Sequence, residues 1–515
     1  MKNFAESLQE VLNEKKNSEK TLTTNDAVSY KSSKTALVDF NFAISGYRNV
    51  DPQTIKNDFS KIFYEESEDI TAKYLAYVMD IREGLGERRT SKFCLQWFAE
   101  THPDIVIKII PFIDFYNRWD TVIFLANPSQ INNEFVRNFA IEKIKNQLIE
   151  DLKNVSTNKS ISLLGKWMPS ENASSKETIR MARYLQKELN VTPKNYRRML
   201  SLLRSKLHVV ECDMSSNNWE NIEYSSVPSK ANLNYANSFM RHDEERRKKY
   251  LESLKKGETK INAKDLAPHE IVRKYTEGYN WYSWSHKTVS YNEDLELLWK
   301  NLKNNQVGDL LIVRDGSGSM TTTTRDGICP LDAATALAIY ASERNKGIWK
   351  DKFITFSANP KFIDLSKCKT LRDKLERTYQ EDSCENTNIY KTMKLILDVA
   401  VKNNYKQKDF PTICILSDMQ WDGRSFNFSE SLFDEIAKLY KSYNYNMPKI
   451  IFWNLDTRVS RTIPMQQNSM GLILLSGFST NLFNMVLSNE IDPYKALLKI
   501  LNSERYKPVE QALQA

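Results

Sequence analysis

The stretch Leu310–Met320, LLIVRDGSGSM, decides how the second half of this chain is interpreted. Its first residues form a continuous apolar run, which is typical of a buried strand in a parallel sheet. The run leads directly into a loop with one carboxylate, two glycines and two serines. The chain has only 14 glycines in 515 residues, so two of them beside two hydroxyls indicate a loop shaped to hold a ligand.

Similar apolar runs recur after this stretch and alternate with amphipathic segments. The expected strands are DLLIVRD (309–315), KFITFS (352–357), TICILSD (412–418), KIIFWNL (449–455) and GLILLSG (471–477). The expected helices begin near Pro330, Thr387, Ser429 and Thr480. This alternation predicts an α/β domain with a doubly wound parallel sheet covered on both faces. Ligands of such sheets bind beyond the carboxyl ends of the strands, where the Gly-Ser loop lies.

The polar residues of this loop have the spacing D-x-S-x-S, in Asp315, Ser317 and Ser319. Small intervening residues allow the three oxygens to converge, and carboxylate and hydroxyl oxygens suit Mg²⁺, for which Mn²⁺ can substitute. Two further oxygen donors follow in order: Thr387 lies just before an expected helix, and Asp418 ends an expected strand. The alternative is a plain turn, with Thr387 as a helix N-cap and Asp418 as a turn residue. The three loops taken together favour a metal site.

The region from about residue 307 to 488 resembles a von Willebrand factor A domain, and these loops resemble its metal-ion-dependent adhesion site. Some residues depart from the family pattern. Gly316 stands where a bulkier apolar residue is common, Glu385 could reach the metal, and Asp422 competes with Asp418 for the acidic role.

The resemblance implies a role for each candidate ligand. Ser317 and Ser319 would bind Mg²⁺ directly, and Thr387 would bind it directly or through water. Asp315 and Asp418 would act mainly through bridging waters. The last coordination position would be left to an acidic residue of a protein partner.

The first half of the chain has helical periodicity with few strand-like runs. Within it, Ser174 and Glu177 have the spacing of a capping box that begins a helix. The expected organisation is a flexible segment at 1–35, an α-helical domain at 36–304, the α/β domain at 305–490, and a C-terminal helix and tail at 491–515.

Most of the net charge of +8 comes from one window of the helical half. Residues 151–200 contain ten Lys or Arg and four Asp or Glu, which gives +6. Steps of four, three and four residues place one basic group on a single helical face: Lys176, Arg180, Arg183 and Lys187. The next expected helix adds Lys194, Arg197 and Arg198.

Such a surface can neutralise several phosphates without reading sequence. The nearby aromatics Trp167, Tyr184 and Tyr196 could stack on unpaired bases. The alternative is a solvated helix face whose aromatics belong to the core.

The resemblance extends into the helical half. IREGLGERRT (81–90), NRWD (117–120) and the pairing of a helical half with an A domain resemble the Ro ribonucleoprotein (TROVE) group and a related uncharacterised family of the same layout. The Ro resemblance implies HEAT-like helical repeats that form a ring, with RNA on the basic helical surface and in the central hole. The sequence therefore predicts a Ro-like protein that binds structured RNA or single-stranded ends. The alternative is a metal-dependent protein–protein interaction scaffold without RNA.

Other classes fit less well. All five histidines precede the α/β region, so the loop serines have no local base, and the loop lacks a P-loop lysine. The six cysteines are scattered without a C-x-x-C pair, and the N-terminus has no apolar signal core. We therefore expect a non-catalytic, cytoplasmic protein without a membrane partner.

Overall fold

The computed structural model of the chain forms two compact units. It describes residues 19–277, 289–356, 359–381, 388–423, 431–458, 462–466, 471–487, 490 and 492–514. The sheet unit comprises Met1–Glu65 and Ala263–Ile500, and the helical unit comprises Glu66–Asn262 and Leu501–Ala515. This division differs from the expected boundaries after residues 35, 304 and 490, because each unit is built from two separate parts of the chain.

The sheet unit contains a six-stranded sheet within its described residues. Its strands are β3 (Leu310–Asp315), β4 (Lys352–Phe356), β5 (Lys361–Asp364), β6 (Thr412–Ser417), β7 (Ile450–Asn454) and β8 (Leu472–Ser476). The order is β5-β4-β3-β6-β7-β8, and all neighbours are parallel except β5, which is antiparallel to β4. The five expected strands are confirmed. The expectation of a purely parallel sheet is wrong, because β5 forms an unpredicted antiparallel edge.

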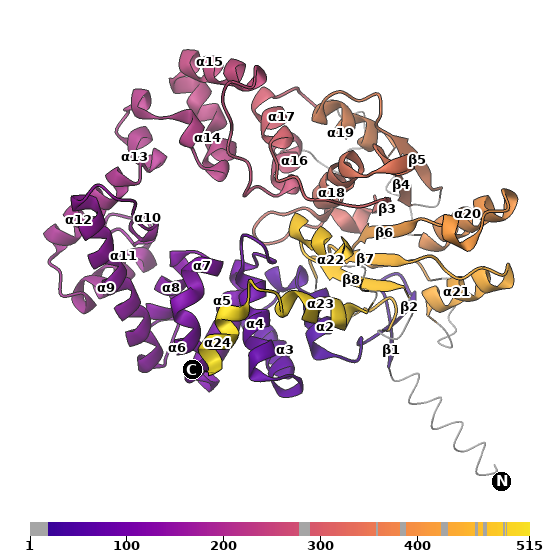
Figure 1. Ribbon diagram of the computed structural model, residues 1–515, viewed down its shortest axis with the longest axis horizontal. Coiled ribbons are helices and arrows are strands. Elements are labelled where there is room, and N and C mark those ends of the chain that lie inside the picture. Colours follow the sequence, from indigo (N-terminus) through magenta and orange to yellow (C-terminus); the bar gives the residue numbers. More distant parts are fainter. Residues whose placement is uncertain are drawn as a thin grey trace, which may run out of the picture. The chain divides into compact units, whose positions relative to one another are not determined.

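The centre of this sheet is a topological switch point. β3 pairs on one side with β4 and on the other with β6, so the chain winds outward in both directions from β3 (Figure 1). Leu311 is opposite Ile413 and Arg314 is opposite Leu416. The carboxyl ends of β3 and β6 therefore meet at one edge, which is where open α/β sheets bind their ligands.

Helices flank the sheet in the same unit. They are α2 (Ala36–Phe42), α3 (Pro52–Glu65), α16 (Pro268–Thr276), α17 (Glu293–Lys300), α18 (Pro330–Arg344), α19 (Leu371–Tyr379), α20 (Ile389–Lys402), α21 (Leu432–Ser442), α22 (Phe483–Leu487) and α23 (Pro493–Leu501), which ends at the boundary between the units. The helix expected from Pro330 is confirmed. Thr387 and Ser429, the other expected starts before α20 and α21, lie outside the described residues. Thr480 begins a short 3₁₀ helix, η8 (Thr480–Leu482), which leads into α22.

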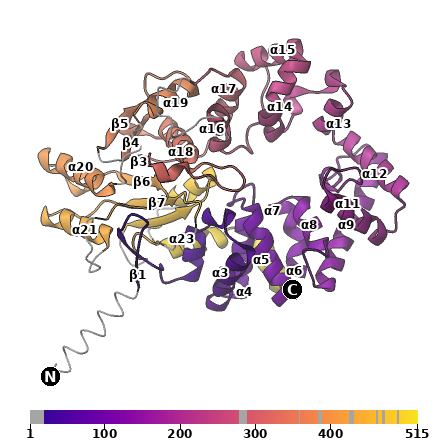
Figure 2. The same ribbon diagram turned by 180° about the vertical axis from the view of Figure 1, so that it is seen from behind.

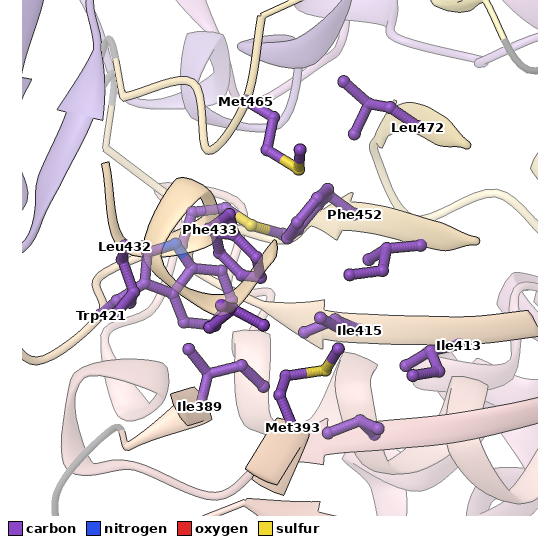
Figure 3. Packing of buried hydrophobic residues seen from close by; sticks show 14 of the residues in the cluster. Ile389, Met393, Ile413, Ile415, Trp421, Leu432, Phe433, Phe452, Met465 and Leu472 are labelled. Atoms are coloured by element: carbon purple, nitrogen blue, oxygen red, sulfur yellow. The ribbon is translucent and has the colours of Figure 1, made fainter. Parts of the chain in front are cut away.

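Apolar side chains on both faces of the strands form the core. On one face, Phe433 of α21 stands edge-on to Phe452 of β7 at a ring-centroid distance of 4.6 Å and to Trp421 at 5.7 Å (Figure 3). On the other face, Trp453 packs against Phe483 of α22 at 4.8 Å, and α18 contacts β3 and β6. Burial on both faces explains why these strands are continuously apolar.

An N-terminal hairpin also belongs to the sheet unit. β1 (Lys20–Leu22) pairs with β2 (Val28–Tyr30) in antiparallel register, and both lie beside the sheet (Figures 1 and 2). The backbone of Tyr30 pairs with that of Ile463, and its hydroxyl donates to Asp434 Oδ2 of α21 at 2.7 Å. The expectation of a flexible segment at 1–35 is therefore wrong for its described part, because long-range contacts hold this hairpin in place.

The helical unit is a succession of helices in which neighbours along the chain pack together. They are α4 (Glu68–Met79), α5 (Arg88–Thr101), α6 (Pro103–Ile109), α7 (Ile113–Tyr116), α8 (Trp119–Ala126), α9 (Glu134–Ser156), α10 (Leu164–Trp167), α11 (Lys176–Glu188), α12 (Pro193–Lys206), α13 (Val210–Ser215), α14 (Ser229–His242), α15 (Glu244–Lys255) and α24 (Lys507–Gln514). The N-cap of α11 is Ser175, which accepts a hydrogen bond from Thr178 N, and not Ser174 as the capping-box spacing predicted. None of the helices in the described residues is long and apolar enough to cross a membrane.

The C-terminal end of the chain returns to this helical unit. Arg505 places Nε 2.5 Å and Nη2 2.8 Å from the carboxylate oxygens of buried Asp80. The ring of Tyr506 stacks on that of Tyr116 at 5.6 Å. The expected separate C-terminal helix and tail is thus divided, and its last part completes the core of the helical unit.

Candidate functional site

The loop after β3 curls back on itself at the carboxyl edge of the sheet. Ser317 N donates to Asp315 Oδ1 at 2.9 Å, and the hydroxyls of Ser317 and Ser319 lie 3.0 Å apart. A 3₁₀ turn, η5 (Gly318–Thr321), follows, and Met320 anchors it in the core. These contacts bring the three oxygen-bearing side chains together, as the D-x-S-x-S spacing predicted.

The loop after β6 brings Asp418 to the same place. Ser417 Oγ donates to Asp315 Oδ2 at 2.5 Å, and the hydroxyl of Ser319 lies near enough to Asp418 to lower the pKa of that carboxyl. Met419 adopts a left-handed backbone conformation with φ of 61°, which turns the chain directly after Asp418. Gln420 N then donates back to Asp418 Oδ1 at 3.2 Å. Four of the five predicted ligands are therefore linked in one cluster, and the fifth, Thr387, lies outside the described residues, as does Glu385.

The N-terminal hairpin braces this second loop. Thr24 donates from both its backbone N and its hydroxyl to Gln420 Oε1, each at 2.7 Å. Gly423 N donates to Asn25 O at 2.7 Å. The backbone of Asp422, the rival acidic candidate, forms a bridge with Asp26 of the hairpin. These contacts hold the loop that carries Asp418 in place. They also show that the backbone of Asp422 takes part in the contact with the hairpin.

The two carboxylates of the cluster are buried, and burial dominates their electrostatics. Asp315 is 0% exposed and Asp418 is 1% exposed. The pKa of Asp418 is raised to about 7, first by burial and then by the neighbouring carboxylates of Asp315 and Asp456, against the opposing effects of Ser319 and Arg458. Burial also raises the pKa of Asp315, against hydrogen bonds from Ser417 and Ser317 that favour its charged form. An added cation would stabilise both charged carboxylates.

Two residues after β7 join the cluster and were not predicted. Asp456 is 1% exposed, and Arg458 lies between it and Asp418. Arg458 Nη2 is 2.9 Å from Asp418 Oδ2, and Arg458 Nε is 3.1 Å from Asp456 Oδ1. A sequence signal existed, because Asp456 follows the strand KIIFWNL as Asp418 follows TICILS.

The donor set fits a hard divalent cation such as Mg²⁺. The four predicted residues in the cluster supply two hydroxyls and two carboxylates, and no thiolate or imidazole among them would favour a softer metal. Within the described ranges, no three His, Cys, Asp or Glu side chains gather closely enough to hold a metal. An ion at this position would therefore depend on the hydroxyls of Ser317 and Ser319 and on water.

The predicted basic surface is exposed in the helical unit. α11 carries its first four members and α12 the others, and all seven side chains are exposed: Lys176, Arg180, Arg183, Lys187, Lys194, Arg197 and Arg198. Arg197 forms an ion pair with Glu171 at 2.7 Å, and Arg183 also acts electrostatically on that carboxylate. In the described part of the chain, Lys176, Arg180 and Lys187 form no ion pair.

The aromatic residues near this surface have different environments. Tyr196 is 0% exposed and donates its hydroxyl to Pro169 O at 2.8 Å, so it belongs to the core and the expectation that it could stack on a base is wrong. Trp167 and Tyr184 are half-buried, and Trp167 carries the guanidinium of Arg118 4.2 Å from its ring centroid. A hollow of about 710 Å³ lies beside α12, lined in part by Arg197 and His208.

Two sequence families of unknown function match this chain. The domain of unknown function DUF2828 matches residues 135–307, and the domain of unknown function DUF7788 matches residues 309–511. The uncharacterized protein L728 of Acanthamoeba polyphaga mimivirus is 28% identical over 526 residues, which cover 95% of this chain and 88% of the viral protein. The chain is thus similar along nearly its whole length to a viral protein described as uncharacterized.

One solved structure is also similar to this chain. The crystal structure of the Deinococcus radiodurans Ro (RSR) protein aligns with 93% of this chain and 100% of its own, at 13% sequence identity and a TM-score of 0.38. A score this low does not establish a shared fold.

Proposed function

We propose that this protein is a non-catalytic RNA-binding protein of the Ro type, whose sheet unit is a von Willebrand factor A domain with a Mg²⁺ site. The observation that carries the RNA proposal is the exposed basic face of α11. Lys176, Arg180, Arg183 and Lys187 project from one side of a single helix, and three of them lack an ion-pair partner among the described residues. Cations held without local carboxylates are available to neutralise phosphates.

The nearby residues of α12 extend this surface. Lys194, Arg197 and Arg198 are exposed on the helix that packs against α11, and the hollow beside α12 gives space at the edge of the basic surface. Trp167 and Tyr184 are each half-buried, so part of each side chain reaches solvent beside this surface. This combination favours single-stranded RNA or RNA ends, whose bases are free to stack.

A salt titration tests the RNA proposal. Each phosphate contact to a single strand releases about 0.7 counterion, so four contacts predict a log–log slope near −3. We expect the variant with all four α11 cations changed to Glu to lose most of this slope and most of its affinity in filter binding with an unstructured RNA. EDTA should change the affinity little, because the metal site is not part of the basic surface.

A charge-matched control separates a specific surface from net charge. Four exposed lysines of the same unit, in or directly after α15, are changed to Glu in the control: Lys248, Lys249, Lys255 and Lys256. The control should keep most of the RNA affinity and most of the slope. RNA binding by the α11 variant that equals that of the unmodified protein would refute the proposal.

The second candidate function is a metal-dependent scaffold for a protein partner without RNA. This function is favoured by the convergence of four candidate ligands at the switch point: Asp315, Ser317, Ser319 and Asp418. A divalent cation bound there could accept an acidic side chain of a protein partner in its remaining coordination position. The scaffold becomes the leading candidate function if the protein binds Mn²⁺ but does not bind RNA.

A further inference from the structure

The carboxyl edge of the sheet concentrates buried negative charge. Asp315 ends β3, Asp418 follows β6 and Asp456 follows β7, and none is more than 1% exposed. β3, β6 and β7 are adjacent parallel strands, so their carboxyl ends share one edge. Buried carboxylates need a compensating cation or must take up protons.

One cation from the chain is already in contact with two of these carboxylates. Arg458 bridges Asp418 and Asp456 through different nitrogens, at 2.9 and 3.1 Å. Its backbone N also donates to Asp456 Oδ1 at 2.9 Å, which ties its position to Asp456 more closely than to Asp418.

The surroundings of Arg458 allow its side chain to move. The side chain is 41% exposed and lies on the loop after β7. Arg314, beside Asp315, is a contrasting cation: it is 0% exposed and its Nε donates to Thr335 Oγ1 of α18 at 2.9 Å. A buried guanidinium in a strand is held in place, whereas an exposed guanidinium on a loop can exchange one partner for solvent at low cost.

We infer that Arg458 is a tethered counter-ion that competes with a divalent cation for Asp418. This inference rests on the proposed Mg²⁺ site. A cation beside Ser317, Ser319 and Asp418 would repel the guanidinium that contacts Asp418 Oδ2, because like charges a few ångströms apart interact strongly in a buried environment. The side chain of Arg458 then leaves Asp418 and stays on Asp456, to which the backbone N is bonded. Arg458 thus lowers the affinity of the site, and ion binding is coupled to the position of this side chain.

Titration of the full chain with Mn²⁺ tests this competition. We compare the unmodified protein with Arg458→Gln, which removes the charge and keeps hydrogen-bond donors. We expect Arg458→Gln to bind Mn²⁺ about tenfold more tightly in calorimetry, which corresponds to about 1.4 kcal/mol. The control is Lys408→Gln, which makes the same charge change at an exposed residue. Lys408 lies shortly before β6, near the amino end of that strand, whereas the candidate site lies at the carboxyl ends. The affinity of this control variant should stay within about twofold, because solvent screens a charge at that distance.

The outcomes distinguish the inference from the metal site itself. If the unmodified protein binds Mn²⁺ and Arg458→Gln binds it equally or more weakly, the competition is refuted and the site stands. If neither the unmodified protein nor Arg458→Gln binds Mn²⁺, the proposed metal site and the competition by Arg458 are both refuted. If Arg458→Gln fails to fold, Arg458→Lys decides the question. A single ammonium has a shorter reach than the guanidinium, so we expect this variant to bind Mn²⁺ about threefold more tightly than the unmodified protein. An affinity that is not higher than that of the unmodified protein overturns the inference.

Discussion

Asp332 is predicted to make the sheet unit less stable as the pH rises from weakly acidic to neutral. It lies in the first turn of α18 and is 1% exposed. It accepts hydrogen bonds from Thr276 Oγ1 at 3.0 Å and from Arg273 at 3.2 Å. Burial nevertheless raises its pKa from 3.8 to about 6, because Arg273, Thr276 and Arg314 only partly offset the loss of hydration.

The direction of the effect follows from proton linkage. Between pH 3.8 and about 6 the folded state binds the proton of Asp332 and the unfolded state does not. This proton therefore stabilises the fold below pH 3.8, and the stabilisation is lost as the pH rises through about 6. The full effect is about 3 kcal/mol, of which about 2 kcal/mol is lost between pH 4.5 and 7.0.

Asp332→Asn replaces the titratable carboxyl group with an amide of nearly the same shape. We expect the free energy of unfolding of the unmodified protein to fall by about 2 kcal/mol relative to the variant between pH 4.5 and 7.0. The assay is urea unfolding at both pH values, read by pulsed hydrogen exchange in peptides of α18, because that signal reports on the sheet unit alone. Asp398→Asn, at an exposed residue of α20, is the control and should change this difference little. An identical pH dependence of the unmodified protein and Asp332→Asn would show that Asp332 is ionised throughout, and the reasoning from burial would be wrong.

Two substitutions test the two loops of the candidate site. The double change Ser317→Ala and Ser319→Ala removes two candidate hydroxyl ligands at the carboxyl edge of the sheet, so we expect Mn²⁺ binding to disappear in calorimetry while thermal unfolding shifts by less than about 1 kcal/mol. Unchanged Mn²⁺ binding by this variant would exclude the assigned ligands. Gly423→Ala would place a Cβ 2.2 Å from Asp26 O, and we expect it to cost about 1–3 kcal/mol and to expose the N-terminal hairpin to rapid limited proteolysis. Protection equal to that of the unmodified protein would contradict the close packing of the hairpin on this loop.

The strands of the sheet were predictable because their signal is local. Both faces of β3, β6, β7 and β8 are covered, so each reads as a continuous apolar run. β5 gives no such signal, since it is a short edge strand in which only Ile363 is buried. The hairpin was missed for a different reason: its position depends on Gln420 and Ile463, which are about 400 residues away in the chain.

The division into units could not be predicted from local composition. The helical unit takes its last helix from the C-terminal end of the chain, where Arg505 pairs with Asp80 across 425 residues. The basic surface was predictable, because helical spacing alone places its members on one face. The fate of each aromatic residue depended on packing, which buried Tyr196 and left part of Trp167 and Tyr184 open.

The candidate site shows how far a spacing rule reaches. A carboxylate directly after a buried parallel strand predicts a group at the functional edge, and this rule selects Asp315 and Asp418. The same rule selects Asp456, but the family pattern directs attention to three other loops. Arg458 has no such signal: its importance comes from two carboxylates that the sheet brings within 3.1 Å of its guanidinium. The sequence can thus predict which oxygens meet at the edge of the sheet, whereas the proposed competition of Arg458 for Asp418 depends on a contact that only the folded loop after β7 makes.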